Sequence, residues 1–285
     1  TANEAALRLF LSAYMPRCDG FNETVDGYGS MFMARPSSCG LMPMPLNYYV
    51  RVNRDASLLI TTSGQTTPCV GRRPQGLLAQ RQHCADALGM YFAEVAHLEA
   101  AAVLAFDVMS RELESLHAPA QLLSAARNAR ADEIRHAAQF AALARAHGVE
   151  PRAPQAGPAS SRGVLEIALE NAAEGVVRET WGALSAAWQA LHASDVDARS
   201  VFQATAADEA QHAQLSRDLD SWLHSQLTAE EQRQVAHAKA DAFTQLRAEL
   251  AASQPHPSVA AAAGVPNRAR SLDLLTRLEQ EMLQC

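Results

Sequence analysis

Two segments of the chain carry the same arrangement of acidic and imidazole side chains. Residues 131–137 read ADEIRHA and residues 207–213 read ADEAQHA, so most positions of the two segments are identical. Each segment holds a Glu and a His three positions apart, and in a helix such a pair projects to one side. The repeat includes the flanking Ala and Asp residues as well as the spacing of Glu and His. We therefore predict that two helices bind one pair of metal ions. The predicted ligands are Glu133, His136, Glu209 and His212.

A di-metal site in a helical bundle also needs one Glu from each of two further helices, at the same height. If the helices on either side of each turn, near 117–118 and 193–194, run antiparallel, residues equally far from the turn lie at the same level along the bundle. Counting in this way places Glu99 and Glu174 at the level of the two motif histidines. These residues precede the motif glutamates by 34 and 35 positions, as expected for two related halves. Glu179 falls at the height of the second motif Glu, so it is an additional or exchangeable ligand.

The positions that surround Glu99 on the predicted inner face are apolar. A lone carboxylate in such a lining would be costly, so several converging carboxylates require cations between them. The lining residues are Phe92, Val95, Ala102, Val103 and Phe106.

Helical periodicity begins near residue 77 and continues to the end of the chain. Helices are expected over 77–116, 119–147, 161–192, 195–223 and 229–252, with a linker over 253–268 and a short amphipathic helix after it. Ser194 or Asp195 is suited to cap the fourth helix, and Thr228 the fifth. The expected organisation is an N-terminal cap (1–76), a helical bundle (77–225) and a C-terminal helical extension (226–285).

The set of four Glu and two Glu-x-x-His partners resembles the ferritin-like di-iron carboxylate superfamily, nearest to its rubrerythrin-like members. The resemblance covers about residues 77–225 and implies a mainly α four-helix bundle with two iron ions; Mn and Zn suit the ligands less well. It also implies that Asp132 and Asp208 orient the histidine of the opposite motif. The chain departs from the family in lacking rubredoxin cysteines, and nothing in the family accounts for residues 1–76.

This resemblance predicts a redox enzyme that reacts with O₂ or peroxide, using a small-molecule substrate or reductant that the sequence does not identify. A ferroxidase or iron-handling protein is an alternative with the same site. A structural or interaction module that keeps the bundle is a third. A homo-oligomer is compatible with all three.

Residues 1–76 have a different character. β-branched and aromatic runs at 47–53 and 58–62 predict a hairpin within an irregular or α+β cap. Four cysteines in the first third of the chain suggest two disulfides and a periplasmic or secreted protein, whereas free thiols in a cytoplasmic protein are the alternative. The chain begins without Met or a basic-then-apolar leader, which fits a trimmed or a mature protein. The disulfide candidates are Cys18, Cys39, Cys69 and Cys84.

Composition narrows the class of partner. The net charge is −7, Lys239 is the single lysine and no stretch clusters enough Arg to follow a phosphate backbone, which argues against nucleic acid. No run of about 18 apolar residues is present, so no transmembrane segment is expected. With 48% hydrophobic and 6% aromatic residues, the chain suits closely packed helices.

Overall fold

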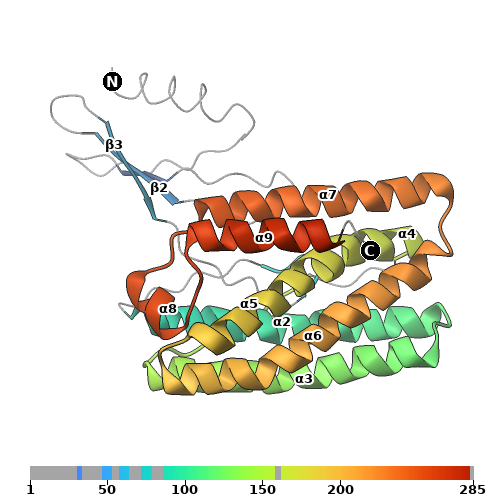
Figure 1. Ribbon diagram of the computed structural model, residues 1–285, viewed down its shortest axis with the longest axis horizontal. Coiled ribbons are helices and arrows are strands. Elements are labelled where there is room, and N and C mark those ends of the chain that lie inside the picture. Colours follow the sequence, from blue (N-terminus) through green and yellow to red (C-terminus); the bar gives the residue numbers. More distant parts are fainter. Residues whose placement is uncertain are drawn as a thin grey trace. The chain divides into compact units, whose positions relative to one another are not determined.

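The computed structural model describes residues 31–33, 47–52, 58–63, 72–78, 86–157 and 162–282. The chain divides into two compact units, Thr1–Gln65 and Thr66–Cys285. Over its described residues the protein is mainly α (Figure 1). The cysteines considered for disulfides lie outside the described residues, so the predicted cap stays a prediction.

The first unit contains strands β1 (Met31–Met33), β2 (Asn47–Val52) and β3 (Leu58–Ser63). They pair antiparallel in the order β1-β2-β3. Phe32 lies opposite Val50 in one ladder, and Val50 lies opposite Ile60 in the other.

The second unit opens on two long antiparallel helices, α2 (Ala87–Ser115) and α3 (Ala120–Ala146). The helix predicted from residue 77 starts at Ala87, because Asp86 caps it by accepting hydrogen bonds from the amides of Leu88 and Gly89. Leu77 instead forms an isolated bridge with Ala156.

The helical stretch predicted over 161–192 is not uniform. It consists of α4 (Val164–Glu170), the π-helix η1 (Asn171–Glu179) and α5 (Thr180–His192). A π-helix widens each turn by about one residue, so side chains after it face a different direction than a regular α-helix would give them. The apolar period of the sequence does not reveal this local change.

Helix α6 (Val196–His224) returns antiparallel to α5 and packs against α3 as well as η1. Of the two predicted cap residues, Asp195 is the one that accepts a hydrogen bond from the amide of Ala198. Helix α7 (Ala229–Ala252) begins with the predicted capping box of Thr228 and Glu231.

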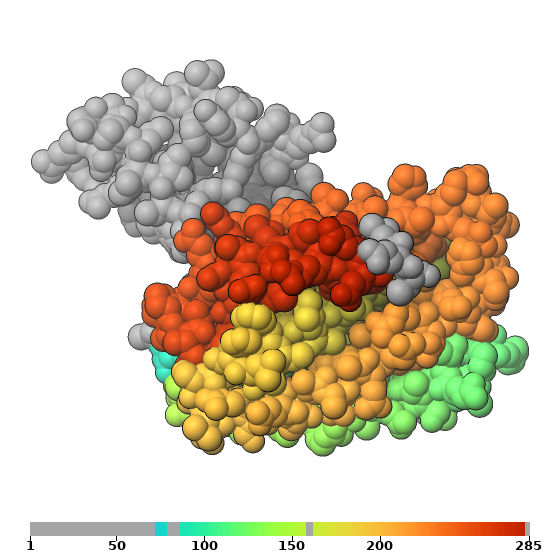
Figure 2. Space-filling view, in the orientation of Figure 1, coloured from blue at the N-terminus to red at the C-terminus, as the bar shows by residue number. Residues whose placement is uncertain are grey.

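The C-terminal part of the chain adds α8 (Pro257–Ala262) and α9 (Arg268–Met282). In Figure 1, α7 and α9 lie side by side on the side of α5 that is away from α2 and α3. Figure 2 shows α9, in red, packed closely against α7 and α5 on this face. Apolar side chains of η1, α5, α7 and α9 form one buried cluster there, including Val177, Trp181, Phe243, Leu246 and Leu275.

Two further apolar clusters fill the space between the long helices. One joins the first half of α2 to the ends of α3 and α6 that contain Phe140 and Phe202. The other joins the second half of α2, including Phe106, to the opposite ends of α3 and α6. No helix in the described part of the chain combines the length and the hydropathy needed to cross a membrane.

Candidate metal centre

A buried polar layer separates these two apolar clusters. Its side chains come from α2, α3, η1 and α6, and each is at most 2% exposed. Along α2 the apolar residues Leu98 and Ala102, one in each cluster, flank the layer at Glu99. The members of the layer are Glu99, Glu133, His136, Glu179, Glu209 and His212.

The layer contains two groups of side chains that can hold a metal ion. The first group is Glu99, Glu133, His136 and Glu209, and the second is Glu179, Glu209 and His212. Within each group, one ligand atom of every residue lies within 4.8 Å of the others. Glu209 belongs to both groups, so its carboxylate would be shared if both groups held a metal ion.

The two histidines present the same ring atom to the carboxylates. Nδ1 of His136 lies 3.2 Å from Oε1 of Glu209 and 3.6 Å from Oε2 of Glu99. Nδ1 of His212 lies 3.2 Å from Oε1 of Glu133. Each imidazole therefore faces the Glu of the opposite motif, which makes Glu133 and Glu209 the shared residues of the layer.

The carboxylates have no hydrogen-bond donors to satisfy them. Among the described residues, both carboxylate oxygens of Glu133, Glu179 and Glu209 lack a hydrogen-bond partner, as does Oε2 of Glu99. Buried polar atoms are normally hydrogen-bonded, and buried charges normally have a counter-charge or a metal. The layer thus fits a bound cation.

The pKa shifts in the metal-free layer also indicate a place for a cation. Burial raises the pKa of Glu99 well above its usual value, and the nearby Glu133 adds to the shift. Burial, followed by repulsion from Glu209, does the same to the pKa of Glu179. Burial alone would lower the pKa of His136, but the attraction of Glu133 and the other nearby carboxylates raises it strongly. The carboxylates thus favour a positive charge beside them.

Each histidine also contacts an aspartate through its other ring nitrogen. Nε2 of His136 lies 3.2 Å from Oδ2 of Asp208, and Nε2 of His212 lies 3.3 Å from Oδ2 of Asp132. An ionised carboxylate only accepts hydrogen bonds, so these contacts favour the proton on Nε2 and leave the lone pair of Nδ1 for a metal.

One exposed guanidinium joins the two aspartates. Arg135 donates from Nη1 to Asp132 and from Nη2 to Asp208, both at 2.8 Å. It therefore connects the outer hydrogen-bond partners of the two histidines. The position that corresponds to Arg135 in the second motif is Gln211, so the repeat is not symmetric here.

Glu174, which counting from the turns placed beside the second motif, lies outside the layer. Its carboxylate accepts hydrogen bonds from the Arg73 side chain at 3.0 Å and faces Arg178 at 3.5 Å. Burial acts to raise its pKa, but the charges of Arg73 and Arg178 outweigh burial and lower it. The structure brings Glu179 into the layer, five residues later on the same π-helix.

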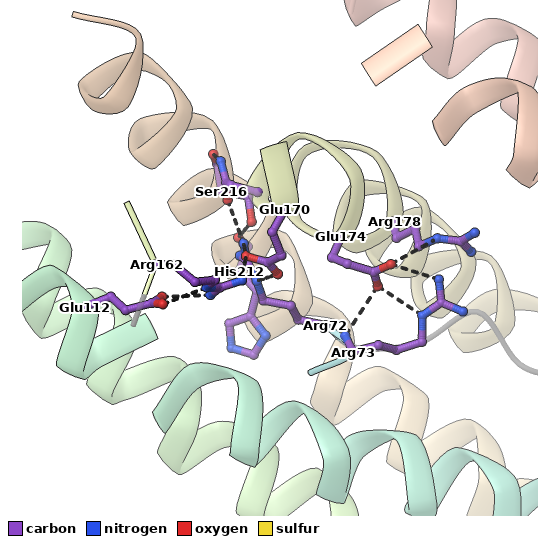
Figure 3. A network of polar contacts seen from close by, with 10 residues as sticks. Arg72, Arg73, Glu112, Arg162, Glu170, Glu174, Arg178, His212 and Ser216 are labelled. Atoms are coloured by element: carbon purple, nitrogen blue, oxygen red, sulfur yellow. Dashed lines mark hydrogen bonds and ion pairs between the residues drawn. The ribbon is translucent and has the colours of Figure 1, made fainter. Parts of the chain in front are cut away.

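Two arginines near the site had no signal in the sequence. Arg72 is buried and pairs with Glu170, and Arg73 pairs with Glu174 (Figure 3). They lie in an irregular segment about 100 positions before their partners, with no periodicity to indicate either contact.

Comparison of the chain with protein-family models, with curated proteins and with solved structures finds no match.

Proposed function

We propose that this protein is a di-iron oxidoreductase on a ferritin-like four-helix bundle, and that it reacts with O₂ or peroxide. The observation that carries the proposal is the convergence of four buried carboxylates, without hydrogen-bond donors among the described residues, on two Nδ1 atoms. Two divalent cations would neutralise the four carboxylates. This is the charge balance that a buried di-metal site requires.

The proposed ligand set uses Glu179 where counting from the turns suggested Glu174. Glu99 and His136 would complete the first metal position, and Glu179 and His212 the second. Glu133 and Glu209 would lie between the two. Carboxylates with imidazoles suit iron and manganese better than softer metals, and iron matches the proposed redox activity.

Two bound iron ions would supply two-electron chemistry toward O₂ or peroxide. The protein's own groups prepare the site for it. Phe92 and Phe106 are fully buried on either side of Glu99 and help keep bulk water away from the layer. Asp132 and Asp208 hold the imidazoles in the orientation in which Nδ1 faces the carboxylates.

Metal analysis and oxidant consumption test the proposal together. Protein from iron-supplemented medium is expected to contain close to two iron ions per chain, and Glu133→Ala to contain fewer. After anaerobic reduction, the iron-loaded protein is expected to consume O₂ or peroxide faster than free ferrous ion and to show a transient visible absorption.

The other outcomes separate the alternatives. Continued uptake and oxidation of added ferrous ion, beyond two per chain, would favour a ferroxidase function over an oxidase function. Protein that takes up no metal at all would contradict the di-metal site and leave a structural or interaction module.

A further inference from the structure

A buried arginine lies at the junction between α4 and the π-helix. Arg72 is 1% exposed, and its Nε and Nη2 donate to the two carboxylate oxygens of Glu170 at 2.8 and 2.9 Å. Nη2 also donates to Oδ1 of Asn171 at 3.0 Å. Glu170 is the last residue of α4 and Asn171 the first of η1. The guanidinium therefore holds both sides of the α-to-π transition.

The contacts continue from Asn171 to a metal-ligand helix. Asn171 donates from Nδ2 to the carbonyl oxygen of Ser216 at 2.9 Å, and Ser216 donates from Oγ to the carbonyl oxygen of His212 at 3.0 Å. Figure 3 shows Arg72, Glu170, His212 and Ser216 gathered in this part of the structure. The network thus links the start of η1 to the backbone of His212.

Gly175 allows this close approach. A Cβ atom at this position would lie 2.4 Å from Oδ1 of Asn171, 2.9 Å from Oγ of Ser216 and 3.0 Å from Nη1 of Arg72. A distance below 3 Å is shorter than van der Waals contact, so any larger residue would displace part of the network. The absence of a side chain at 175 is what makes room for the guanidinium and the amide.

Burying the Arg72 guanidinium costs free energy, which a purely structural contact would have to offset. Arg72 is buried, and its Nη1 has no hydrogen-bond partner among the described residues. A buried ion pair adds little to stability compared with apolar packing, so its retention calls for another reason. Besides Glu170, the charge of Glu179 acts on the Arg72 guanidinium, so the arginine and the proposed ligand are electrostatically linked.

The position of Glu179 depends on the register of η1. Glu179 is the last residue of this π-helix. If η1 changed to α-helical hydrogen bonding, the residues after the change would rotate by about 100° relative to α4. Glu179 would then face away from Glu209 and His212.

We propose that Arg72 is a positioning residue for the second metal position: it holds the α4–η1 junction in the register in which Glu179 faces Glu209 and His212. This inference rests on the proposed di-metal function. It predicts a selective effect, because no ligand of the first position lies on η1. The ligands of that position are Glu99, Glu133, His136 and Glu209.

Anaerobic titration of metal-free protein with Co²⁺, followed by calorimetry and visible absorption, tests the selectivity. Arg72→Gln is expected to keep one ion per chain with wild-type affinity and to weaken the second by roughly 10- to 100-fold. Arg72→Lys, which keeps the charge but not the forked contact, is expected to weaken the second ion less. Amide hydrogen exchange over 170–180 in the metal-free Arg72→Gln protein is expected to be faster than in the wild type.

Arg247→Gln is the control variant. Arg247 donates to Thr276 at 3.0 Å and to Glu279 at 2.5 Å, so it joins α7 to α9 and belongs to a different set of contacts from Arg72 and Glu170. This variant is expected to lose stability and to keep both ions.

The outcomes separate the two proposals. A wild-type protein that binds fewer than two ions would contradict the di-metal function itself. A wild type with two ions, together with Arg72→Gln at wild-type affinity for both or equally weakened at both, would overturn only the role of Arg72. If Arg72→Gln does not fold, the same comparison is made with Arg72→Lys. Wild-type affinity at both positions, or an equal loss of affinity at both, would then overturn the inference.

Discussion

Asp132 and His212 belong to different repeats of the same motif and contact each other across the bundle, with 3.3 Å between Oδ2 and Nε2. Asp208 and His136 make the reciprocal contact at 3.2 Å. Each motif therefore positions the histidine of the other. Arg135 bridges the two aspartates, so one guanidinium contacts the hydrogen-bond partners of both histidines.

Arg135→Gln should weaken binding of both metal ions, because it removes the donor that holds both aspartates in place. The expected loss in Co²⁺ affinity is roughly tenfold at each position, at the lower end for residues that orient ligands. Calorimetric titration of the metal-free protein measures it. Arg145→Gln breaks an exposed pair with Glu150 and serves as the control. Unchanged affinity in Arg135→Gln would show that the aspartates do not need this contact.

Glu179 and Glu174 offer a comparison within one π-helix. Glu179→Gln should reduce metal content to about one ion per chain, because the second position loses its terminal carboxylate. Glu174→Gln should keep two ions, since its carboxylate is occupied by Arg73 and Arg178. Elemental analysis of both purified variants decides between them. The reverse pattern would return Glu174 to the ligand set.

The metal-free protein should be destabilised by its own ligands. Replacing Glu99 by Gln removes a buried carboxylate whose Oε2 lacks a hydrogen-bond partner among the described residues. The metal-free variant should gain on the order of 1–3 kcal/mol in free energy of unfolding, while its metal affinity falls. Urea unfolding of metal-free wild type and Glu99→Gln measures the gain. A variant that is less stable than the wild type would argue that this carboxylate is compensated within the protein.

The buried Glu99 and Glu179 should make the stability of the metal-free protein depend on pH. The pKa values of Glu99 and Glu179 are raised in the folded state above the usual 4.5, first of all by burial. Their contribution to stability is therefore fully present below pH 4.5 and is lost as the pH rises through the raised folded values. The Tm of metal-free protein should therefore fall as the pH rises above 4.5. The double variant Glu99→Gln/Glu179→Gln should show a smaller fall, and an equal slope in both proteins would contradict this cause.

The cysteines are the subject of a separate prediction. Non-reducing mass spectrometry of protein made in an oxidising compartment should find the four N-terminal cysteines joined in pairs. Cys18–Cys39 and Cys69–Cys84 are the pairs closest in sequence, and each bond would contribute about 3 kcal/mol in the chain-entropy model. Four alkylatable thiols would instead favour the cytoplasmic location over the periplasmic or secreted one that we propose.

The sequence and the structure agree most closely at the repeated Glu-x-x-His motif, whose geometry is set within a single helix. Glu133 and His136 share a face of α3 because a regular helix carries them there, and Glu209 with His212 does the same on α6. Counting from the turns also led to Glu99, on an uninterrupted α-helix.

The same construction placed Glu174 in the main ligand set and kept Glu179 only as an additional or exchangeable ligand, because it assumed a constant rotation and rise per residue. The π-helix breaks that assumption, and it is defined by backbone hydrogen bonds that leave no mark in the apolar period. The contacts of Arg72 and Arg73 were equally hidden, since they join an irregular segment to residues about 100 positions later. Long-range pairs of this kind depend on how the elements pack.

The polar layer between two apolar clusters has a consequence for how the protein matures. Its ligands come from both helical pairs, and the last of them, His212, is far along the chain. During synthesis, α2 and α3 can pack together before α6 has been made, but neither metal position is then complete. A complete metal position can therefore form only late, after the second pair has packed against the first. Until then the carboxylates of the half-assembled core stay exposed to solvent, where a charged group costs little.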